Sequence, residues 1–252
     1  MKKLIAANWK MNKTVDDAIS TIKELKVLLK DHQEADVLIC PPYTSLAAAG
    51  SEMKGSIIKL GAQNMHYEES GAFTGEISAL MLKNASCEYV LIGHSERREF
   101  FNEDNEFLNK KMHAALKHGL KPILCIGETL DQRQKNETED VLETQLLACL
   151  RDVTEIEKVT IAYEPVWAIS RGNTSTKPAT KNDAEAAHLF IRQILKGIYD
   201  EAKAKKVRIL YGGSMKPENA KELLEMPNIN GGLVGNASLS AKSFFEIIKS
   251  AR

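Results

Sequence analysis

The chain has 252 residues, of which 43% are hydrophobic, so it can bury a large core without disulfides or metal ions. Its 34 basic residues balance 34 acidic ones, which leaves no positive excess for binding nucleic acid or an anionic membrane. The four cysteines, at positions 40, 87, 125 and 149, form no Cys-x-x-Cys pair, which argues against a zinc site and against a disulfide framework. The apolar run near the N-terminus is too short for a signal peptide or a membrane span, so we expect a cytoplasmic protein without a metal or cofactor.

Eight short apolar runs follow one another along the chain, and each is followed by a helical pattern. The runs cover residues 4–7, 37–40, 57–62, 89–93, 122–126, 159–163, 207–211 and 232–235. They are continuous rather than alternating, which is typical of parallel strands buried on both faces. We therefore predict eight parallel strands.

The helical patterns cover residues 18–29, 45–53, 78–84, 105–118, 141–150, 184–203, 217–225 and 241–250. Eight strand–helix units in a chain of 252 residues match the size and order of a (β/α)8 barrel. No linker or change in composition divides the chain, so we predict one α/β domain over residues 1–252, with eight parallel strands ringed by helices. An open doubly wound sheet is the alternative, but no Gly-x-Gly-x-x-Gly follows the first strand.

Several polar side chains stand directly after predicted strands. Asn8 and Lys10 follow the first strand, His94 follows the fourth, and Glu164 follows the sixth. Active sites of (β/α)8 barrels are built at the carboxyl ends of the strands, so these four residues would share one rim. Each residue alone has an ordinary explanation as a solvated charge or a polar partner. Their occurrence on one rim favours an active site with Glu164, at the end of an apolar run, as a base.

Glycine-rich turns follow the seventh and eighth predicted strands. Gly212-Gly213-Ser214 leaves the seventh strand and Gly235-Asn236 leaves the eighth. Glycine lets the backbone approach a ligand closely, and N–H groups near a helix start can bind an anion. Loops at these two positions are the recurrent phosphate site of such barrels. The sequence therefore predicts a small phosphorylated ligand, and the polar groups around its reacting end favour proton transfer next to a carbonyl.

Six motifs, in order along the chain, resemble the triosephosphate isomerase family. They are Asn8-Trp9-Lys10-Met11-Asn12, Gly93-His94-Ser95-Glu96-Arg97-Arg98, Cys125-Ile126-Gly127-Glu128-Thr129, Ala162-Tyr163-Glu164-Pro165-Val166-Trp167, Tyr211-Gly212-Gly213-Ser214 and Leu233-Val234-Gly235-Asn236-Ala237-Ser238-Leu239. The resemblance covers the chain from residue 4 to about residue 250. It implies an isomerase that interconverts dihydroxyacetone phosphate and D-glyceraldehyde 3-phosphate through an enediolate.

The resemblance also implies a role for each residue around the reacting end of the substrate. Glu164 would move a proton between C1 and C2 of the substrate. His94, at a helix start whose dipole disfavours the imidazolium, would donate to the carbonyl oxygens as a neutral electrophile. Lys10 would stabilise the enediolate and the phosphate, Asn8 would position the substrate, and Glu96 would be a supporting carboxylate.

The phosphate contacts and the lid follow from the same resemblance. Main-chain N–H groups of Ser214, Gly235 and Asn236 would hold the phosphate, together with Ser170 of a lid over residues 168–180. Tyr211 and Ser214 would latch the closed lid.

The loop around Phe73-Thr74-Gly75 resembles the dimer arm of the family, so we expect a homodimer. The partners implied are thus a second copy of the chain and a small phosphorylated triose, with no nucleic acid and no membrane.

The lid departs from the family pattern. In the family, Ala-Ile-Gly-Thr-Gly stands between a Pro-x-Trp hinge and a Lys-x-Ala hinge. Here nine residues, 168–176, stand between Pro165-Val166-Trp167 and Lys177-Pro178-Ala179. Ser170 takes the place of the first glycine, and the sequence leaves open whether Ser170 or Gly172 contacts the phosphate. Because the entropic cost of closing a loop grows slowly with its length, we expect the lid still to close.

Asn236 replaces a glycine of the family's Gly-Gly pair, and asparagine tolerates left-handed backbone better than most residues.

Two alternatives to the isomerase function stay open. Another phosphate-binding barrel enzyme would explain the glycine turns but not Asn8, Lys10, His94 and Glu164 together. A non-catalytic barrel that binds phosphate or a protein partner would explain the altered lid.

Overall fold

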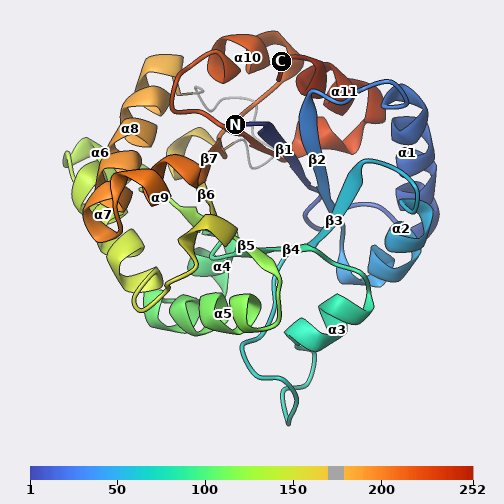
Figure 1. Ribbon diagram of the computed structural model, residues 1–252, viewed down its shortest axis with the longest axis horizontal. Coiled ribbons are helices and arrows are strands. Elements are labelled where there is room, and N and C mark those ends of the chain that lie inside the picture. The colour runs from blue at the N-terminus through green and yellow to red at the C-terminus, as the bar shows by residue number, and fades with distance from the viewer. Residues whose placement is uncertain (170–178, 252) are drawn as a thin grey trace.

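Eight parallel strands close into a barrel in the order β1 to β8 (Figure 1). The computed structural model describes residues 1–169 and 179–251. The strands are β1 (Lys3–Asn8), β2 (Ala35–Cys40), β3 (Ile58–Ala62), β4 (Tyr89–Ile92), β5 (Lys121–Ile126), β6 (Thr160–Tyr163), β7 (Arg208–Tyr211) and β8 (Gly231–Val234). The predicted barrel of eight parallel strands is therefore confirmed.

Helices surround the barrel at the predicted positions (Figure 1). They are α1 (Val15–Leu28), α2 (Leu46–Glu52), α3 (Ala79–Asn84), α5 (Asn105–Lys117), α7 (Thr138–Cys149), α8 (Lys181–Ile198), α10 (Pro217–Leu224) and α11 (Ala241–Lys249). The short helix α4 (Ser95–Phe100) begins after His94, as the resemblance implied, whereas α6 (Leu130–Gln134) was not predicted. Short 3-10 turns join some of these elements: η1 (Tyr43–Ser45), η2 (Ile156–Lys158), η3 (Val166–Ala168) and η4 (Asn236–Leu239).

The prediction of one long helix over residues 184–203 is wrong. Helix α8 ends at Ile198, and a separate helix, α9 (Glu201–Lys206), follows it. The break lies at Asp200, whose backbone is extended and whose Oδ1 accepts a hydrogen bond from the N–H of Lys203 at 2.7 Å. An aspartate that caps a new helix in this way competes with continuation of the preceding one.

The core has two layers, one inside the barrel and one between the barrel and its helices. Alternate strand residues fill the interior: Leu4, Ala6, Leu38, Cys40, Tyr89, Leu91, Ile123, Cys125, Ala162, Leu210 and Leu233. The residues between them, such as Ile5, Val37 and Ile161, pack outward against the helices. Burial on both faces explains why the strands appear as continuous apolar runs.

Two features of the fold position the candidate site and the surface around it. All eight strands are parallel, so their carboxyl ends meet at one rim of the barrel. The loop between β3 and α3 extends away from the barrel beyond the ring of helices (Figure 1).

A search of the described ranges finds no helix of the length and apolar character that a membrane span requires.

Candidate active site

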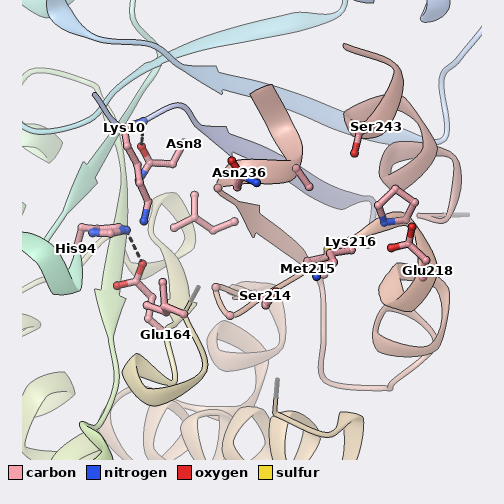
Figure 2. A pocket seen from close by; sticks show the side chains of 17 residues that line it. Asn8, Lys10, His94, Glu164, Ser214, Met215, Lys216, Glu218, Asn236 and Ser243 are labelled. Atoms are coloured by element: carbon pink, nitrogen blue, oxygen red, sulfur yellow. Dashed lines mark hydrogen bonds and ion pairs between the residues drawn. The ribbon is translucent and has the colours of Figure 1, made fainter. Parts of the chain in front are cut away.

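A cavity of about 450 Å³ opens at the carboxyl-terminal rim of the barrel (Figure 2). Residues from the ends of five strands line it: Asn8, Lys10, His94, Glu164, Ser214, Gly235 and Asn236. The structure thus brings together the residues that the sequence placed after the first, fourth, sixth, seventh and eighth strands. We refer to this space as the rim cavity.

Glu164 is 2% exposed, and two donors hold its carboxylate. Oε1 lies 3.0 Å from Nε2 of His94, and Oε2 accepts a hydrogen bond from the main-chain N–H of Ser95 at 2.9 Å. Both donors stabilise a buried carboxylate that would otherwise be costly to keep out of water. Sequence reasoning did not assign Ser95 a role, although its N–H is one of the free donors expected at the start of a helix.

The hydrogen bonds of His94 assign its tautomer. His94 precedes the first residue of α4, and its Nδ1 accepts a hydrogen bond from the N–H of Glu96 at 3.3 Å. Nδ1 therefore carries no proton, and the proton of the neutral ring lies on Nε2, which faces Glu164 (Figure 2). In this arrangement the Nε2 donor is engaged by the Glu164 carboxylate.

Lys10 reaches the rim cavity from a turn with a left-handed backbone, at φ 52°. Its N–H donates to Oδ1 of Asn8 at 3.0 Å, and its carbonyl accepts from Nε2 of Gln63 at 2.9 Å. These two side chains hold a conformation that lysine seldom adopts. The Lys10 ammonium lies 2.6 Å from Oε1 of Glu96, which the resemblance implied as a supporting carboxylate without naming its partner. Gln63 was not predicted.

The turn after β7 requires two glycines because it passes very close to other groups. A Cβ on Gly212 would lie 2.8 Å from Cγ of Glu164, and one on Gly213 would lie 2.3 Å from the hydroxyl oxygen of Tyr211. The Tyr211 hydroxyl is buried and finds no hydrogen-bond partner in the part of the chain that the structure describes. Burial raises the pKa of Tyr211, so the hydroxyl remains a donor.

The turn after β8 passes beside the lysine. A Cβ on Gly235 would lie 3.6 Å from Cε of Lys10, and Asn236 begins the 3-10 turn η4. Asn236 does not have a positive φ. The backbone here therefore does not depend on the left-handed tolerance of asparagine, and replacing glycine at this position causes no backbone strain.

The first hinge of the lid is fixed to a buried carboxylate. Glu128 is fully buried and accepts hydrogen bonds from Nε1 of Trp167 at 2.8 Å and from the hydroxyl of Tyr163 at 3.0 Å. The guanidinium of Arg133 lies over the Trp167 ring, 4.5 Å from its centroid, and its Nη1 lies 3.5 Å from Oε1 of Glu128. The sequence contained Glu128 in a motif, but nothing local to it indicated these partners.

The predicted phosphate contacts of the lid lie outside the described residues, and metal ligands can be sought only within them. Ser170 and Gly172, the alternative phosphate contacts of the lid, fall within residues 170–178, for which no structure is described. Within residues 1–169 and 179–251, no three histidine, cysteine, aspartate or glutamate side chains cluster as metal ligands.

Comparisons with known proteins agree with one another. The family model described as triosephosphate isomerase matches residues 3–251. The triosephosphate isomerase of Dictyoglomus turgidum is 49% identical over 251 residues, which are 99% of each chain. That of Clostridium botulinum strain Loch Maree is 51% identical over 247 residues, or 97% of this chain and 98% of its own. The crystal structure of the enzyme from Bartonella henselae superposes with a TM-score of 0.90 at 39% identity, over 99% of both chains.

Proposed function

Because this chain belongs to the triosephosphate isomerase family, we propose that Glu164, His94 and Lys10 catalyse its interconversion of dihydroxyacetone phosphate and D-glyceraldehyde 3-phosphate. The observation that carries this assignment is the meeting of the three side chains in the rim cavity (Figure 2). A buried carboxylate, a neutral imidazole and an ammonium group are the parts that proton transfer next to a carbonyl requires.

In the proposed reaction, the Glu164 carboxylate removes a proton from C1 of dihydroxyacetone phosphate. The C–H electron pair becomes the C1–C2 double bond, and the carbonyl electron pair moves onto the C2 oxygen. His94 donates from Nε2 to that oxygen, and Lys10 supplies positive charge near it. Glu164 then returns its proton to C2, while proton transfer between the two oxygens through His94 leaves the aldehyde at C1. A glutamate base paired with a neutral histidine is the established pattern for this enzyme.

The contacts of Glu164 support one further part of the proposal, a change in its position when substrate binds. His94 donates to Oε1 of Glu164 at 3.0 Å, so it cannot serve the substrate oxygen until this contact is released. The Ser95 N–H holds the other carboxylate oxygen at 2.9 Å. The proposal therefore includes a movement of the Glu164 side chain, with the substrate carbonyl taking over the imidazole donor.

The remaining rim residues bind the rest of the substrate in this proposal. Main-chain N–H groups of Ser214, Gly235 and Asn236 hold the phosphate, whose charge the nearby Lys10 ammonium partly neutralises. Asn8 contributes through the turn that it holds at Lys10. The resemblance adds Ser170 of the lid to this set, with Tyr211 and Ser214 as the latch.

The test is isomerase turnover of glyceraldehyde 3-phosphate by the purified protein and by Glu164→Gln. The amide has nearly the same shape but cannot accept a proton, so we expect kcat to fall by about 10²–10⁴-fold. Glu222→Gln, an exposed change on α10, serves as the control and should keep full turnover. A loss below ten-fold in Glu164→Gln would reject Glu164 as the base. An analogue that binds to the unmodified protein without any turnover would favour the non-catalytic barrel.

We further propose that the protein is a cytoplasmic homodimer with a single domain over residues 1–252. The four cysteines are all buried free thiols, which suits a reducing compartment. The loop around Phe73-Thr74-Gly75 would form the dimer contact, since Phe73 is 42% exposed on a loop that projects from the barrel (Figure 1).

A further inference from the structure

Helix α6 presents an arginine to three other segments of the chain, although it adds nothing to the core. It has five residues, and none of them is buried. Arg133 lies in its last turn, and the guanidinium is next to three groups. They are the Trp167 ring of η3, the Glu128 carboxylate of the β5–α6 loop and the Asp183 carboxylate of α8. Arg133 therefore links α6 to all three segments.

The Glu128 carboxylate is fully buried, and its hydrogen-bond donors are neutral. Nε1 of Trp167 donates to it at 2.8 Å, and the Tyr163 hydroxyl lies 3.1 and 3.0 Å from its two oxygens. Among the basic side chains of residues 1–169 and 179–251, only Arg133 forms an ion pair with Glu128, at 3.5 Å. A buried carboxylate has lost its stabilisation by water, so this guanidinium compensates its charge.

Arg133 is itself held by Asp183. Oδ1 of Asp183 accepts a hydrogen bond from Nη2 of Arg133 at 2.7 Å, and its Oδ2 accepts from the Thr180 hydroxyl and N–H at 2.6 and 3.1 Å. The Thr180 hydroxyl, followed by the Thr180 N–H and Arg133, holds the pKa of Asp183 below its ordinary value, so Asp183 is ionised at neutral pH. A planar guanidinium can serve two carboxylates and an aromatic ring together, which the compact charge of lysine does less well.

The groups that Glu128 holds stand on either side of Glu164 in the chain. Tyr163 directly precedes Glu164, and Trp167 follows it three residues later. Between them, the N–H of Val166 donates to the main-chain carbonyl of Glu128 at 3.1 Å. The segment that carries Glu164 is therefore attached to Glu128 at both ends and near its middle.

We propose that Arg133 is a positioning residue for the isomerase reaction: it compensates the buried charge of Glu128 and so fixes the segment that carries Glu164. Without the guanidinium, the Glu128 carboxylate would draw in water or turn toward solvent, and Tyr163 and Trp167 would lose their acceptor. A misplacement of about 1 Å at a reacting group can lower a rate by about 10²-fold. The inference rests on the proposed role of Glu164 as the base.

The first test is the effect of Arg133 variants on turnover, at a temperature at which circular dichroism shows each variant folded. Arg133→Met removes the charge but keeps an unbranched side chain that can pack on the Trp167 ring. It should lower kcat by at least about ten-fold, because the base is displaced. The KM for glyceraldehyde 3-phosphate should change by less than about three-fold, because Arg133 does not line the rim cavity.

Two further variants control for charge and for arginine loss in general. Arg133→Lys keeps the charge and should hold kcat within about three-fold of the parent. Arg151→Met removes an exposed arginine at the end of α7 and should leave both constants unchanged. A kcat of Arg133→Met within three-fold of the parent, or a change in KM alone, would overturn the proposal.

The second test separates charge compensation from packing. Glu128→Gln keeps the shape of the side chain and an oxygen for Trp167, but it removes the buried charge that Arg133 compensates. In the Glu128→Gln background, Arg133→Met should therefore lower kcat by less than about three-fold, against at least about ten-fold in the parent. An equal loss in both backgrounds would show that Arg133 acts through packing, and would refute the compensation of charge.

A third readout follows Trp167 without turnover. The chain has two tryptophans, so NMR gives two indole N–H signals, and Trp9→Phe identifies the signal of Trp167. In Arg133→Met, the indole N–H of Trp167 should exchange with solvent at least about ten-fold faster, because its hydrogen bond to Glu128 is weakened. The Trp9 indole, which donates to the Ser238 carbonyl, is the internal reference. An unchanged exchange rate at Trp167 would contradict the proposal.

These results also distinguish a failure of this inference from a failure of the proposed function. If Glu164→Gln keeps its turnover, Glu164 is not the base, whatever Arg133→Met does. If Glu164→Gln loses its turnover while Arg133→Met keeps it, only the role of Arg133 is rejected.

Discussion

Two adjacent residues at the start of α4 hold the carboxylate of Glu164 through different kinds of atom. His94 uses its ring Nε2, and Ser95 uses its main-chain N–H. The same helix start fixes the tautomer of His94, because the N–H of Glu96 donates a hydrogen bond to Nδ1. One turn of backbone therefore sets both the position of the Glu164 carboxylate and the tautomer of His94.

Another histidine, His188 of α8, is buried for a structural reason. It is fully buried, its Nδ1 lies 3.2 Å from the carbonyl oxygen of Asn228, and its ring meets Tyr163 edge-on at 5.9 Å. Burial lowers the pKa of His188 from 6.5 to about 3. Between those two pH values the unfolded chain binds a proton that the folded chain does not. The stabilisation from the neutral ring is complete above pH 6.5 and declines as the pH falls toward 3.

His188→Asn should make stability less dependent on pH. Asparagine can still donate to the Asn228 carbonyl but does not titrate. Between about pH 7.5 and about pH 5, the unfolding free energy of the parent should fall by roughly 2 kcal/mol more than that of the variant. The reason is that about 1.5 pH units of this range lie below the pKa of the unfolded histidine, and each unit changes the free energy by about 1.4 kcal/mol. Guanidinium unfolding at both pH values measures this. His113→Asn, at an exposed histidine on α5, is the control, and identical pH dependence of His188→Asn and the parent would contradict the prediction.

At the level of elements, a side-chain cap marks the start of α9. Asp200 caps the helix through Lys203, and Tyr199 before it has left helical geometry. Asp200→Ala should therefore lower the unfolding free energy by about 1 kcal/mol, the usual cost of losing such a cap. Urea denaturation with Glu143→Ala on the exposed face of α7 as control tests this. A change equal to that of the control would show that α9 starts without the cap.

The elements differ in how well the sequence predicts them. Each strand contains a short, mostly apolar run, so the pattern alone located all eight, although β2 and β3 also contain Asp36 and Lys59. Helix α6 has five residues and only one apolar side chain, Leu130, which faces solvent rather than the core, so no periodicity indicated it. The break at Asp200 was missed because the apolar spacing continues on both sides of it.

The site shows the same division between local and long-range signals. The residues that follow strands were predictable because the barrel places all strand ends on one rim. The residues that hold these side chains in place were not predictable. Gln63 reaches Lys10 across 53 positions and Glu128 reaches Trp167 across 39, and a hydrogen bond between such distant residues leaves no local pattern.

For the whole molecule, the loop between β3 and α3 is the part that the barrel itself does not explain. The loop packs on itself and on α5. The His66 ring stacks on Tyr67 at 4.5 Å and lies tilted against Phe73 at 4.4 Å, and Tyr67 meets Phe107 of α5 edge-on at 5.4 Å. The His66 N–H donates to the Ile77 carbonyl at 2.8 Å. Phe73 nevertheless remains 42% exposed, and Met11, on the loop after β1, is 96% exposed. Ordered loops that present apolar side chains to solvent are typical of interaction surfaces.

Phe73→Asp should therefore weaken the proposed homodimer. A charge placed on an apolar contact at the centre of an interface should raise the dimer dissociation constant by about 30-fold or more. Sedimentation at about micromolar concentration should show a dimer for the parent and for Leu147→Asp, which adds the same charge on α7 away from the loop. A parent that sediments as a stable, active monomer would refute the dimer. A dimeric Phe73→Asp would place the interface on another face, because an ordered loop cannot bury an aspartate against a second copy without a partner for its charge.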